Sequence, residues 1–410
     1  MITRKECDRP VPSFTFARGN ATRLLSLPLY ALGRLASAFV RRDDDHWVFA
    51  SGSGLGEGAL ALYRFARDAD PSLKLAWLAR DRDELARARA LGMIAVLRSS
   101  WRGFRTTLRA RVIVVTHGLG DGNRFGTHGA FLVQLWHGIP LKKIQLDSPV
   151  TFRGGPARML RALYRRNISA IGLVPAASEV SAARLRSAFG LPADRVVVTG
   201  DPRDDIVLTP SGHARTLLAQ VVGDYGRDRT ILFAPTWRDG DPDPAIPTAA
   251  EWQRIAAFLE QGESVLVLRP HPHSVGDYAA GPAVSARIRM LSASAQNDLN
   301  PVLPALDVLV TDYSSVAFDF ALLGRPIAFL APDAHEYTAT RGLYEPYREF
   351  TGGSDVTTWD EVLALLGDPT ALARLGAHAV HLAATHHEYR DGRNTARVYE
   401  ELLTRLGGQE

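Results

Sequence analysis

Two histidines of this 410-residue sequence, His137 and His271, follow apolar runs at positions that suit acid–base chemistry. His137 ends the run 131–136 and precedes a glycine and a proline, which force a turn. At the carboxyl end of a strand, close to Lys142 and Lys143, such a histidine can act as a general base near neutral pH. The alternative is a core histidine bonded to a backbone carbonyl. Its place at the end of a strand favours the functional interpretation.

The second histidine lies in the segment Arg269-Pro270-His271-Pro272-His273, directly after the apolar run 264–268. The two prolines stiffen this loop and limit where His271 can point. His271 and His273 are spaced like a pair of metal ligands. Because no cysteine or group of acids nearby would complete the site, we expect no metal there.

A third polar group, Thr236-Trp237-Arg238, follows the apolar run 230–234. An arginine suits a bidentate phosphate contact, and a tryptophan can stack on a nucleobase. An ordinary loop with an arginine salt bridge explains these residues equally well.

A fourth group comes after the run 308–311, where Ser314 and Ser315 precede a predicted helix. Either serine can cap that helix. Free N–H groups at a helix start, together with two hydroxyls, form a ready site for a pyrophosphate. Capping alone is the simpler alternative. The arginines and the histidine at neighbouring strand ends favour a diphosphate cradle.

Glycines at positions 52, 54, 56 and 58 follow another short apolar run. Their spacing differs from that of the dinucleotide fingerprint G-x-G-x-x-G. We therefore interpret this loop as a tight strand-to-helix turn and assign it no ligand.

The elements that must position these groups alternate between strands and helices along the whole chain. Such alternation indicates parallel, doubly wound sheets, whose carboxyl edges carry the ligands. The sequence predicts an α/β fold with two Rossmann-like domains facing across a cleft. Strands are expected at 47–50, 73–78, 94–97, 111–116, 131–136, 171–175, 195–199, 230–234, 264–268, 308–311 and 326–330.

Three segments follow from this pattern: an N-terminal extension over 1–45, a first domain over 46–205 and a second over 206–410, whose last helix can cross back. The charge-rich stretch 201–228 is expected to connect the domains. Within the extension, leucines and arginines of 20–40 predict a basic amphipathic helix. That helix would either lie on an anionic membrane or pack on the first domain.

The composition is that of a globular protein, with 46% hydrophobic and 22% charged residues, which excludes gross disorder. Cys7 is the only cysteine, so no intrachain disulfide can form. The sequence shows neither an apolar stretch long enough to span a bilayer nor a signal peptide. The net charge is +4, yet residues 98–166 hold 13 basic and two acidic residues, a local excess of +11. This excess predicts an anionic partner.

Taken together and in order, these motifs resemble the CDP-glycerol glycerophosphotransferase family, which builds teichoic acids and capsule polymers. The similarity covers roughly residues 45–405. The matching segments are Trp136-His137-Gly138-Ile139-Pro140-Leu141-Lys142, Thr199-Gly200-Asp201-Pro202-Arg203-Asp204-Asp205, Ala234-Pro235-Thr236-Trp237-Arg238, Arg269-Pro270-His271-Pro272, Thr311-Asp312-Tyr313-Ser314-Ser315, Phe318-Asp319-Phe320-Ala321, Arg325-Pro326-Ile327 and Tyr389-Arg390-Asp391-Gly392-Arg393-Asn394.

The resemblance implies a GT-B fold with an acceptor domain first and a CDP-donor domain second. It implies transfer of a polyol phosphate, most simply glycerol phosphate, from CDP-glycerol or CDP-ribitol to a hydroxyl of a membrane-linked acceptor, with release of CMP. His137 would be the base, and His271 would act on the pyrophosphate as a charge stabiliser or acid. No further cofactor is implied. The residues expected to bind the donor are Thr236, Arg238, Arg269, Thr311, Asp312, Ser314, Ser315 and Asp319.

The basic block is then expected to bind the acceptor polymer and an anionic membrane, which implies a cytoplasmic protein held peripherally on the inner face of the cell membrane. A GT-B glycosyltransferase using a nucleotide sugar is the competing enzyme. A nucleic-acid-binding protein is disfavoured, because few aromatic residues are interspersed in the block. Its expected acceptor and membrane contacts are Lys142, Lys143, Arg158, Arg161, Arg165 and Arg166.

Overall fold

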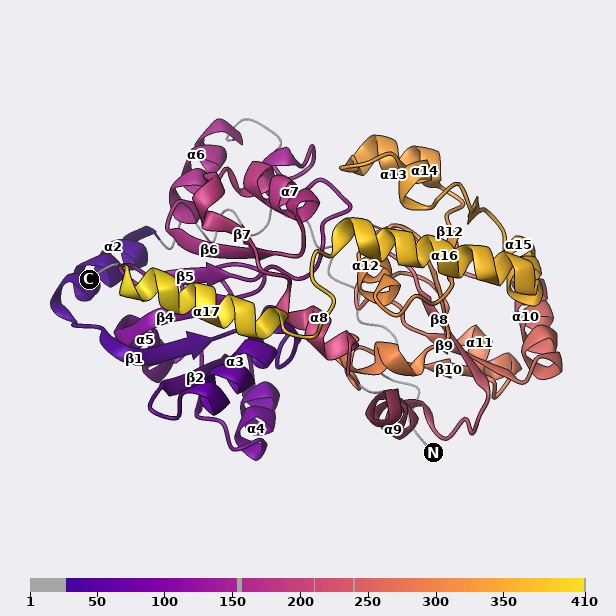
Figure 1. Ribbon diagram of the computed structural model, residues 1–410, viewed down its shortest axis with the longest axis horizontal. Helices are drawn as coiled ribbons and strands as arrows, with labels where there is room; N and C mark the ends of the chain where they lie inside the picture. The colour runs from indigo at the N-terminus through magenta and orange to yellow at the C-terminus, as the bar shows by residue number, and fades with distance from the viewer. Residues whose placement is uncertain (1–26, 153–156, 210, 239, 409–410) are drawn as a thin grey trace.

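The computed structural model describes residues 27–152, 157–209, 211–238 and 240–408, and these form two lobes side by side (Figure 1). Each lobe is built on one sheet, of seven and six strands respectively. All strand pairs in both sheets are parallel. The two-lobed α/β architecture expected from the alternating pattern is confirmed.

The first sheet has the strand order β3-β2-β1-β4-β5-β6-β7, in which the chain starts in the middle and winds outward in both directions. Alternate residues of β1 enter two different cores: Trp47 and Phe49 pack on one face, and Val48 packs on the other. This explains why the strands are continuous apolar runs. The strands are β1 (Asp43–Phe49), β2 (Lys74–Ala79), β3 (Ala95–Leu97), β4 (Ala110–Val115), β5 (Phe131–Gln134), β6 (Ile171–Ala176) and β7 (Val196–Val198).

The second sheet has the order β10-β9-β8-β11-β12-β13 and the same winding. Ile231 and Phe233 of β8 pack beside Trp252 on one face, whereas Leu232 enters the core on the other face. The strands are β8 (Arg229–Ala234), β9 (Ser264–Leu268), β10 (Ile288–Met290), β11 (Val308–Thr311), β12 (Ile327–Leu330) and β13 (Asp355–Val356).

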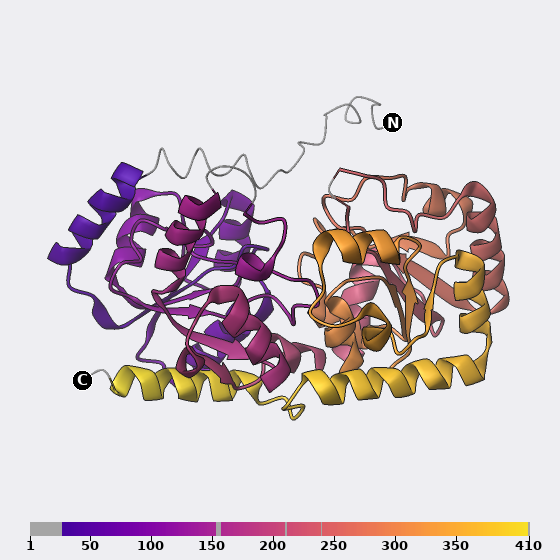
Figure 2. The ribbon, with the colours of Figure 1, turned by 90° about the horizontal axis from the view of Figure 1, so that it is seen from above.

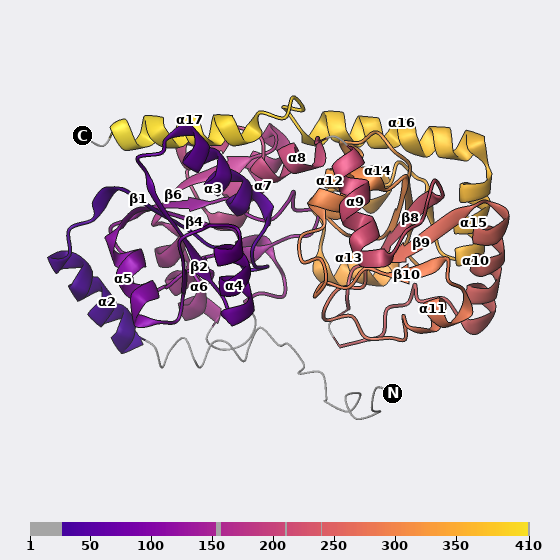
Figure 3. The ribbon, with the colours of Figure 1, turned by 90° about the horizontal axis from the view of Figure 1, so that it is seen from below.

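Helices connect the strands and cover the faces of both sheets (Figures 1 and 3). They are α2 (Leu27–Phe39), α3 (Glu57–Ala69), α4 (Arg82–Ala90), α5 (Trp101–Arg109), α6 (Ala157–Ile168), α7 (Glu179–Phe189), α8 (Pro202–Val207), α9 (Ser211–Val222), α10 (Ala249–Gln261), α11 (Ala280–Val284), α12 (Val316–Ala321), α13 (Ala334–Arg341), α14 (Tyr347–Phe350), α15 (Trp359–Gly367), α16 (Pro369–His386) and α17 (Asn394–Gly407), with 3-10 turns η1 (Gln145–Asp147), η2 (Ala193–Arg195) and η3 (Asn300–Ala305).

The last two helices, α16 and α17, lie end to end along one side of the molecule and span both lobes (Figure 2). α16 runs along the second lobe, and α17 packs on α3 and α8. The carboxylate of Asp205 caps α17 by accepting hydrogen bonds from the backbone N–H groups of Asn394 and Thr395, at 3.0 and 2.7 Å. The motif around Arg203 and the motif ending at Asn394 therefore meet in space.

The stretch 201–228, expected as a connection, instead contains helices α8 and α9. Its pattern is misleading because charged side chains of α8 are buried: Arg203 is 9% and Asp204 is 2% exposed. A helix that buries its charges lacks the apolar periodicity on which a sequence-based prediction depends.

The described part of the N-terminal extension holds helix α2 and the first residues of β1. Residues 1–26, including part of the predicted amphipathic helix, lie outside the described residues. One face of α2 packs on the first lobe, where the Tyr30 ring contacts the Phe125 ring at 5.1 Å. The opposite face leaves Leu29, Leu32, Leu35 and Phe39 exposed by 50 to 82%. α2 therefore packs on the first lobe and, on its opposite side, exposes an apolar face of the kind expected for a helix that lies on a membrane.

Candidate active site

His137 lies three residues past β5, in a loop with unusual backbone geometry. Its neighbours Trp136 and Gly138 both have positive φ angles, +63° and +121°. A Cβ atom on Gly138 would lie 3.1 Å from a guanidinium nitrogen of Arg203 and 3.5 Å from the hydroxyl of Ser315. The turn thus brings His137 to the junction of the lobes, and Gly138 allows the close approach.

Hydrogen bonding and burial define the state of the His137 ring. Nδ1 lies 3.5 Å from the backbone carbonyl of Thr116, which can only accept a hydrogen bond, so Nδ1 carries the proton and Nε2 keeps its lone pair. Burial lowers the pKa of His137 well below its usual value, and electrostatic repulsion from His117, Arg203 and Lys142 adds to this effect. His137 is therefore neutral at pH 7.

His271 follows β9 and has the opposite tautomer. Its Nδ1 accepts a hydrogen bond of 3.2 Å from the backbone N–H of His273, which leaves the proton on Nε2. The ring stacks on Trp237 with centroids 5.5 Å apart. Desolvation by the surrounding protein, followed by the charges of His273 and Lys142, lowers the pKa of His271 to about 4. The neutral ring can thus donate a hydrogen bond from Nε2.

Lys142 connects these groups across the junction. It is half-buried and forms an antiparallel β-bridge with Leu343 of the second lobe. Its charge acts on His137 and His271, and it also favours the ionised form of Asp312. The lysine that we expected among the acceptor and membrane contacts is therefore close enough to both histidines to act on each. Lys143 is exposed, and its backbone N–H donates to Gly342.

Arg238, expected on the donor, is buried in a network of its own. Its Nε and Nη2 bond both oxygens of Asp333 at 2.8 and 2.9 Å, and its Nη1 contacts Asp312 at 3.1 Å. Asp312 also accepts a 2.8 Å bond from the backbone N–H of Thr236. These contacts fix the side chains of Arg238 and Asp312 at the ends of β8 and β11. The hydroxyl of Thr236 is buried without a partner.

The remaining donor residues differ in what their side chains contact. Thr311 donates a 2.7 Å hydrogen bond to the carbonyl of Ala234, and the Ser314 hydroxyl accepts one of 3.4 Å from Val316. Ser315 makes no side-chain capping bond and lies beside Gly138. Arg269 donates to the carbonyls of Leu291 and Asn297, each at 3.2 Å.

Asp319 belongs to a buried charge cluster between the lobes. Arg203 donates to Asp319 at 2.5 Å and to the side chain of Asn300 at 3.0 Å. Burial raises the pKa of Asp319 to about 6, although Arg203 opposes that shift. Asp201 and Asp298 add to the negative charge around Arg203 and raise its pKa. Asp319 therefore holds Arg203 beside the His137 loop.

Nearby, His387 joins α16 to this cluster. Its two ring nitrogens lie 3.0 Å from the carboxylate of Asp204 and 3.1 Å from the backbone carbonyl of Phe318. Burial disfavours charge on the ring, but the negative charge of Asp204 outweighs it and raises the pKa of His387.

Sequence reasoning missed His117, although a usable signal was present. Like His137, His117 lies a few residues past a buried strand, here two residues past the end of β4. The same criterion, applied to every strand end, would have found it. Arg203 was part of a matched motif, yet only the fold shows that it faces Asp319.

The basic residues of the block 98–166 include both exposed side chains and side chains with hydrogen-bond or ion-pair partners. Arg158, Arg161, Arg165 and Arg166 are exposed on α6. Elsewhere in the block, Arg109 pairs with Asp43 at 2.9 Å, and Arg98 donates to two backbone carbonyls.

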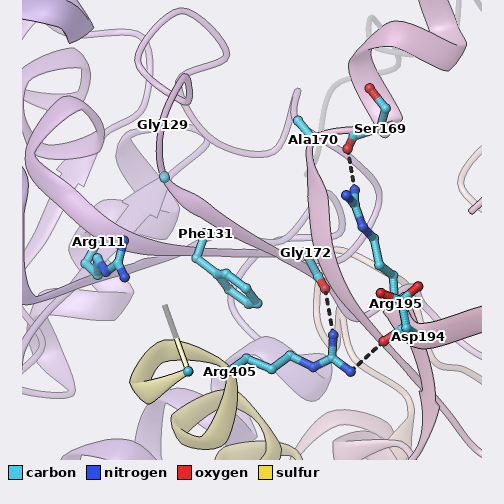
Figure 4. Close-up of a pocket in the computed structure, with 11 residues that line it drawn as sticks. Arg111, Gly129, Phe131, Ser169, Ala170, Gly172, Asp194, Arg195 and Arg405 are labelled. Atoms are coloured by element: carbon cyan, nitrogen blue, oxygen red, sulfur yellow. Dashed lines mark hydrogen bonds between the residues drawn. The ribbon is translucent and has the colours of Figure 1, made fainter. Parts of the chain in front are cut away.

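A pocket of about 520 Å³ lies at the opposite edge of the first sheet, near the amino ends of β5 and β6 (Figure 4). Arg405 donates to the carbonyls of Gly172 and Asp194, and Arg195 donates to that of Ile171. The contacts of Arg405 fasten the end of α17 to the first lobe. Ligands of doubly wound sheets bind at the carboxyl edge instead.

Two further observations concern the described residues only. Within them, no group of three or more His, Cys, Asp or Glu side chains could hold a metal ion. Across the same residues, no helix is both long and apolar enough to cross a membrane.

Solved structures with the same architecture were found by comparison. The wall teichoic acid polymerase TagF aligns with a TM-score of 0.74 and 19% identity, covering 97% of this chain and 100% of the TagF chain. A UDP-N-acetylglucosamine 2-epimerase aligns with a TM-score of 0.56 and 15% identity, covering 90% and 97% of the two chains. At such identities these likenesses establish the fold alone, and they confirm the expected GT-B architecture.

Curated relatives carry sequence similarity to the chain. The teichoic acid ribitol-phosphate polymerase TarK of Staphylococcus aureus (strain NCTC 8325 / PS 47) is 27% identical over 280 residues, 67% of this chain and 52% of TarK. A teichoic acid poly(glycerol phosphate) polymerase of Bacillus subtilis (strain 168) is 27% identical over 309 residues, 74% of this chain and 41% of the relative. The chain spans about half the length of these relatives, or less.

A family model described as CDP-Glycerol:Poly(glycerophosphate) glycerophosphotransferase matches residues 34–404. This range contains every motif on which the resemblance in the sequence depends. The chain therefore belongs to the CDP-glycerol:poly(glycerophosphate) glycerophosphotransferase family.

Proposed function

We propose that this protein transfers a polyol phosphate from a CDP-polyol to a hydroxyl of a membrane-linked acceptor, with release of CMP. The observation that carries the proposal is the pair of neutral histidines. His137 keeps a free lone pair on Nε2, and His271 carries a proton on Nε2. Each follows the carboxyl end of a strand in its own lobe, and the charge of Lys142 reaches both.

This pair supports an in-line displacement. The acceptor oxygen forms a bond to the phosphorus that bears the polyol, and its proton passes to Nε2 of His137. The bond from that phosphorus to the bridging oxygen breaks, and CMP leaves with the electron pair. His271 donates from Nε2 to a phosphate oxygen as negative charge develops there. General base catalysis of this kind is typically worth about 10²–10⁴-fold.

Donor binding is assigned to the second lobe. The unpartnered hydroxyl of Thr236 and the hydroxyls of Ser314 and Ser315 are proposed to contact the diphosphate. Arg238 and Asp312 support this edge by fixing the loops after β8 and β11.

Glycerol phosphate is the transferred unit that the family description favours, and ribitol phosphate is the alternative that relatives such as TarK favour. The test is incubation with CDP-glycerol or CDP-ribitol and a lipid-linked acceptor, followed by mass spectrometry. The product mass identifies the unit, and a ladder of products distinguishes a polymerase from a primase. CMP release from neither donor would refute the proposal, and UDP release from a UDP-sugar would indicate a glycosyltransferase.

We also propose peripheral attachment to the inner face of the cell membrane. The apolar face of α2 and the exposed arginines of α6 have complementary chemistry for acyl chains and anionic headgroups. Substitution of both Leu32 and Phe39 by Ser is expected to reduce co-sedimentation with vesicles of anionic lipid. The same double substitution at Leu91 and Ile94, which are exposed elsewhere on the first lobe, is the matched control. The proposal would be contradicted if the two double substitutions reduced vesicle binding equally, or if the protein bound nucleic acid more strongly than vesicles.

A further inference from the structure

His117 lies against the proposed base. Its ring stacks on that of His137 with centroids 4.0 Å apart and an interplanar angle of 6°. On another side the ring meets Gly52, where a Cβ atom would lie 2.6 Å from it. No larger residue fits at Gly52 unless His117 moves. Packing against His117 therefore explains why the second residue of the glycine-rich loop is a glycine.

A chain of hydrogen bonds leads away from His117. Its Nδ1 lies 2.8 Å from the hydroxyl of Thr116, that hydroxyl donates to Ser51 at 3.0 Å, and Ser51 donates to Glu57 at 2.9 Å. Each hydroxyl has a single proton and uses it to donate to the next group toward Glu57. In the bond between His117 and Thr116, Nδ1 of His117 must therefore be the donor. The chain therefore fixes the tautomer of His117, with the lone pair on Nε2.

Both ends of this chain are anchored. Asp121 accepts hydrogen bonds from the backbone N–H groups of Thr116 and His117 at 2.9 and 2.6 Å. At the other end, the backbone N–H of Glu57 donates to Asp298 of the second lobe at 2.6 Å. Thr116 also holds His137 through its carbonyl, so one residue orients both rings.

We propose that His117 is a positioning residue for His137: its stacked ring, fixed by the Thr116–Ser51–Glu57 hydrogen-bond chain, orients the base. The catalytic part of this inference rests on the proposed function, in which His137 accepts the proton of the acceptor hydroxyl. The geometric part, the coupling between the two rings, stands on the structure alone.

The charges around the two rings set the expected pH effects. Burial is the largest cause of the lowered pKa of His137, and His117, Arg203 and Lys142, which face the ring, lower it further. His117 faces the carboxylate of Asp121. Burial raises the pKa of Asp121, and His117 opposes that shift without cancelling it. Two protonated rings stacked 4.0 Å apart would repel each other. Removing His117 removes this repulsion and makes protonation of His137 easier, so the pKa of His137 should rise.

The first test is an NMR titration of the whole protein labelled at its 12 histidines, with the His137 signal identified by its loss in His137→Gln. His117→Phe keeps a flat ring and is expected to raise the pKa of His137 by about half a unit or more. His381→Phe, at an exposed position on α16, is the control and should leave that pKa unchanged.

Ser51→Ala provides an independent variant, because it breaks the chain without touching either ring. It should shift the ¹⁵N signature of His117 from the Nδ1–H toward the Nε2–H tautomer. Ser53→Ala is the matched control, since Ser53 bonds Ser51 at 2.9 Å but lies outside the path to Glu57. An unchanged pKa of His137 in His117→Phe, together with an unchanged tautomer in Ser51→Ala, would overturn the inference.

Kinetics separate this inference from the proposed function. If the wild-type protein releases CMP, His117→Phe is expected to lower kcat ~10-fold or more and to move the acid limb of the pH profile upward, with little change in the donor KM. A residue that only fills space would leave the acid limb in place, and that result would refute positioning. If the wild-type protein releases no CMP, the proposed function fails, and the NMR titration still decides the coupling.

Discussion

Arg203 offers the sharpest test of how the two lobes are held together. Its guanidinium contacts Asp319 at 2.5 Å and Asn300 at 3.0 Å, and the side chains of Arg203 and Asp319 are 11% and 1% exposed. Removing one partner of a buried ion pair typically costs ~3–5 kcal/mol, because the other charge stays buried without compensation. We expect Arg203→Gln to lower the free energy of unfolding by about this amount at pH 8.

The loss of stability in Arg203→Gln should depend on pH, and the direction of this dependence follows from the pKa of Asp319. The pKa of Asp319 is already raised to about 6 by burial, against the opposing charge of Arg203. Without Arg203 that pKa rises further, so the folded variant holds a proton over a wider range than the wild type. At pH 5 the carboxyl is protonated in both proteins and the difference is small. As the pH rises through 6 toward 8, the loss grows.

The assay is urea unfolding followed by tryptophan fluorescence at several pH values between 5 and 8. The control is Arg254→Gln, which breaks a surface pair with Asp360 whose side chains are 48% and 63% exposed. That loss should stay below ~1 kcal/mol at every pH. The reasoning is refuted if Arg203→Gln costs no more than the control at pH 8, or if its cost is the same from pH 5 to pH 8.

Three further predictions address the catalytic pair and the crossing helix. His137→Gln should reduce CMP release by about 10²–10⁴-fold while CDP-glycerol binding, measured calorimetrically, persists; near-normal turnover would remove His137 from the mechanism. His271→Gln should weaken use of the donor more than it lowers the melting temperature, and unchanged donor kinetics would contradict its phosphate contact. Gly200→Ala, at φ +80° with a Cβ only 2.2 Å from Asn394, should destabilise the fold by ~1–3 kcal/mol in thermal unfolding. Gly92→Ala, at φ +73° in open space, carries the backbone strain without the clash, and equal losses would exclude the packing argument.

The sequence alone predicted the first sheet and the central strands of the second, because these strands are apolar runs that end in turn residues. It did not predict the short edge strands β10 and β13 of the second sheet. β8, β9 and β11 lie where the apolar runs predict them, and each is followed by the expected polar group. The positions of His137 and His271 followed from the same rule, since a residue after a buried parallel strand must lie at the ligand edge.

Helix α8 was missed for the opposite reason. Its buried side chains are charged, and their partners come from distant segments: Arg203 meets Asp319, and Asp204 meets His387. A local hydrophobic pattern carries no information about such pairs.

The membership of a family and the order of its motifs were thus determined by the sequence itself. Only the tertiary structure decided which of those residues are free to act. Arg238 and Arg269 looked like phosphate ligands, yet Arg238 is bound to Asp333 and Arg269 to backbone carbonyls. His117 drew no attention, yet it stacks on His137. The physical reason is that burial, hydrogen-bond partners and charge depend on contacts between segments far apart in the chain, and these set the protonation state on which acid–base chemistry depends.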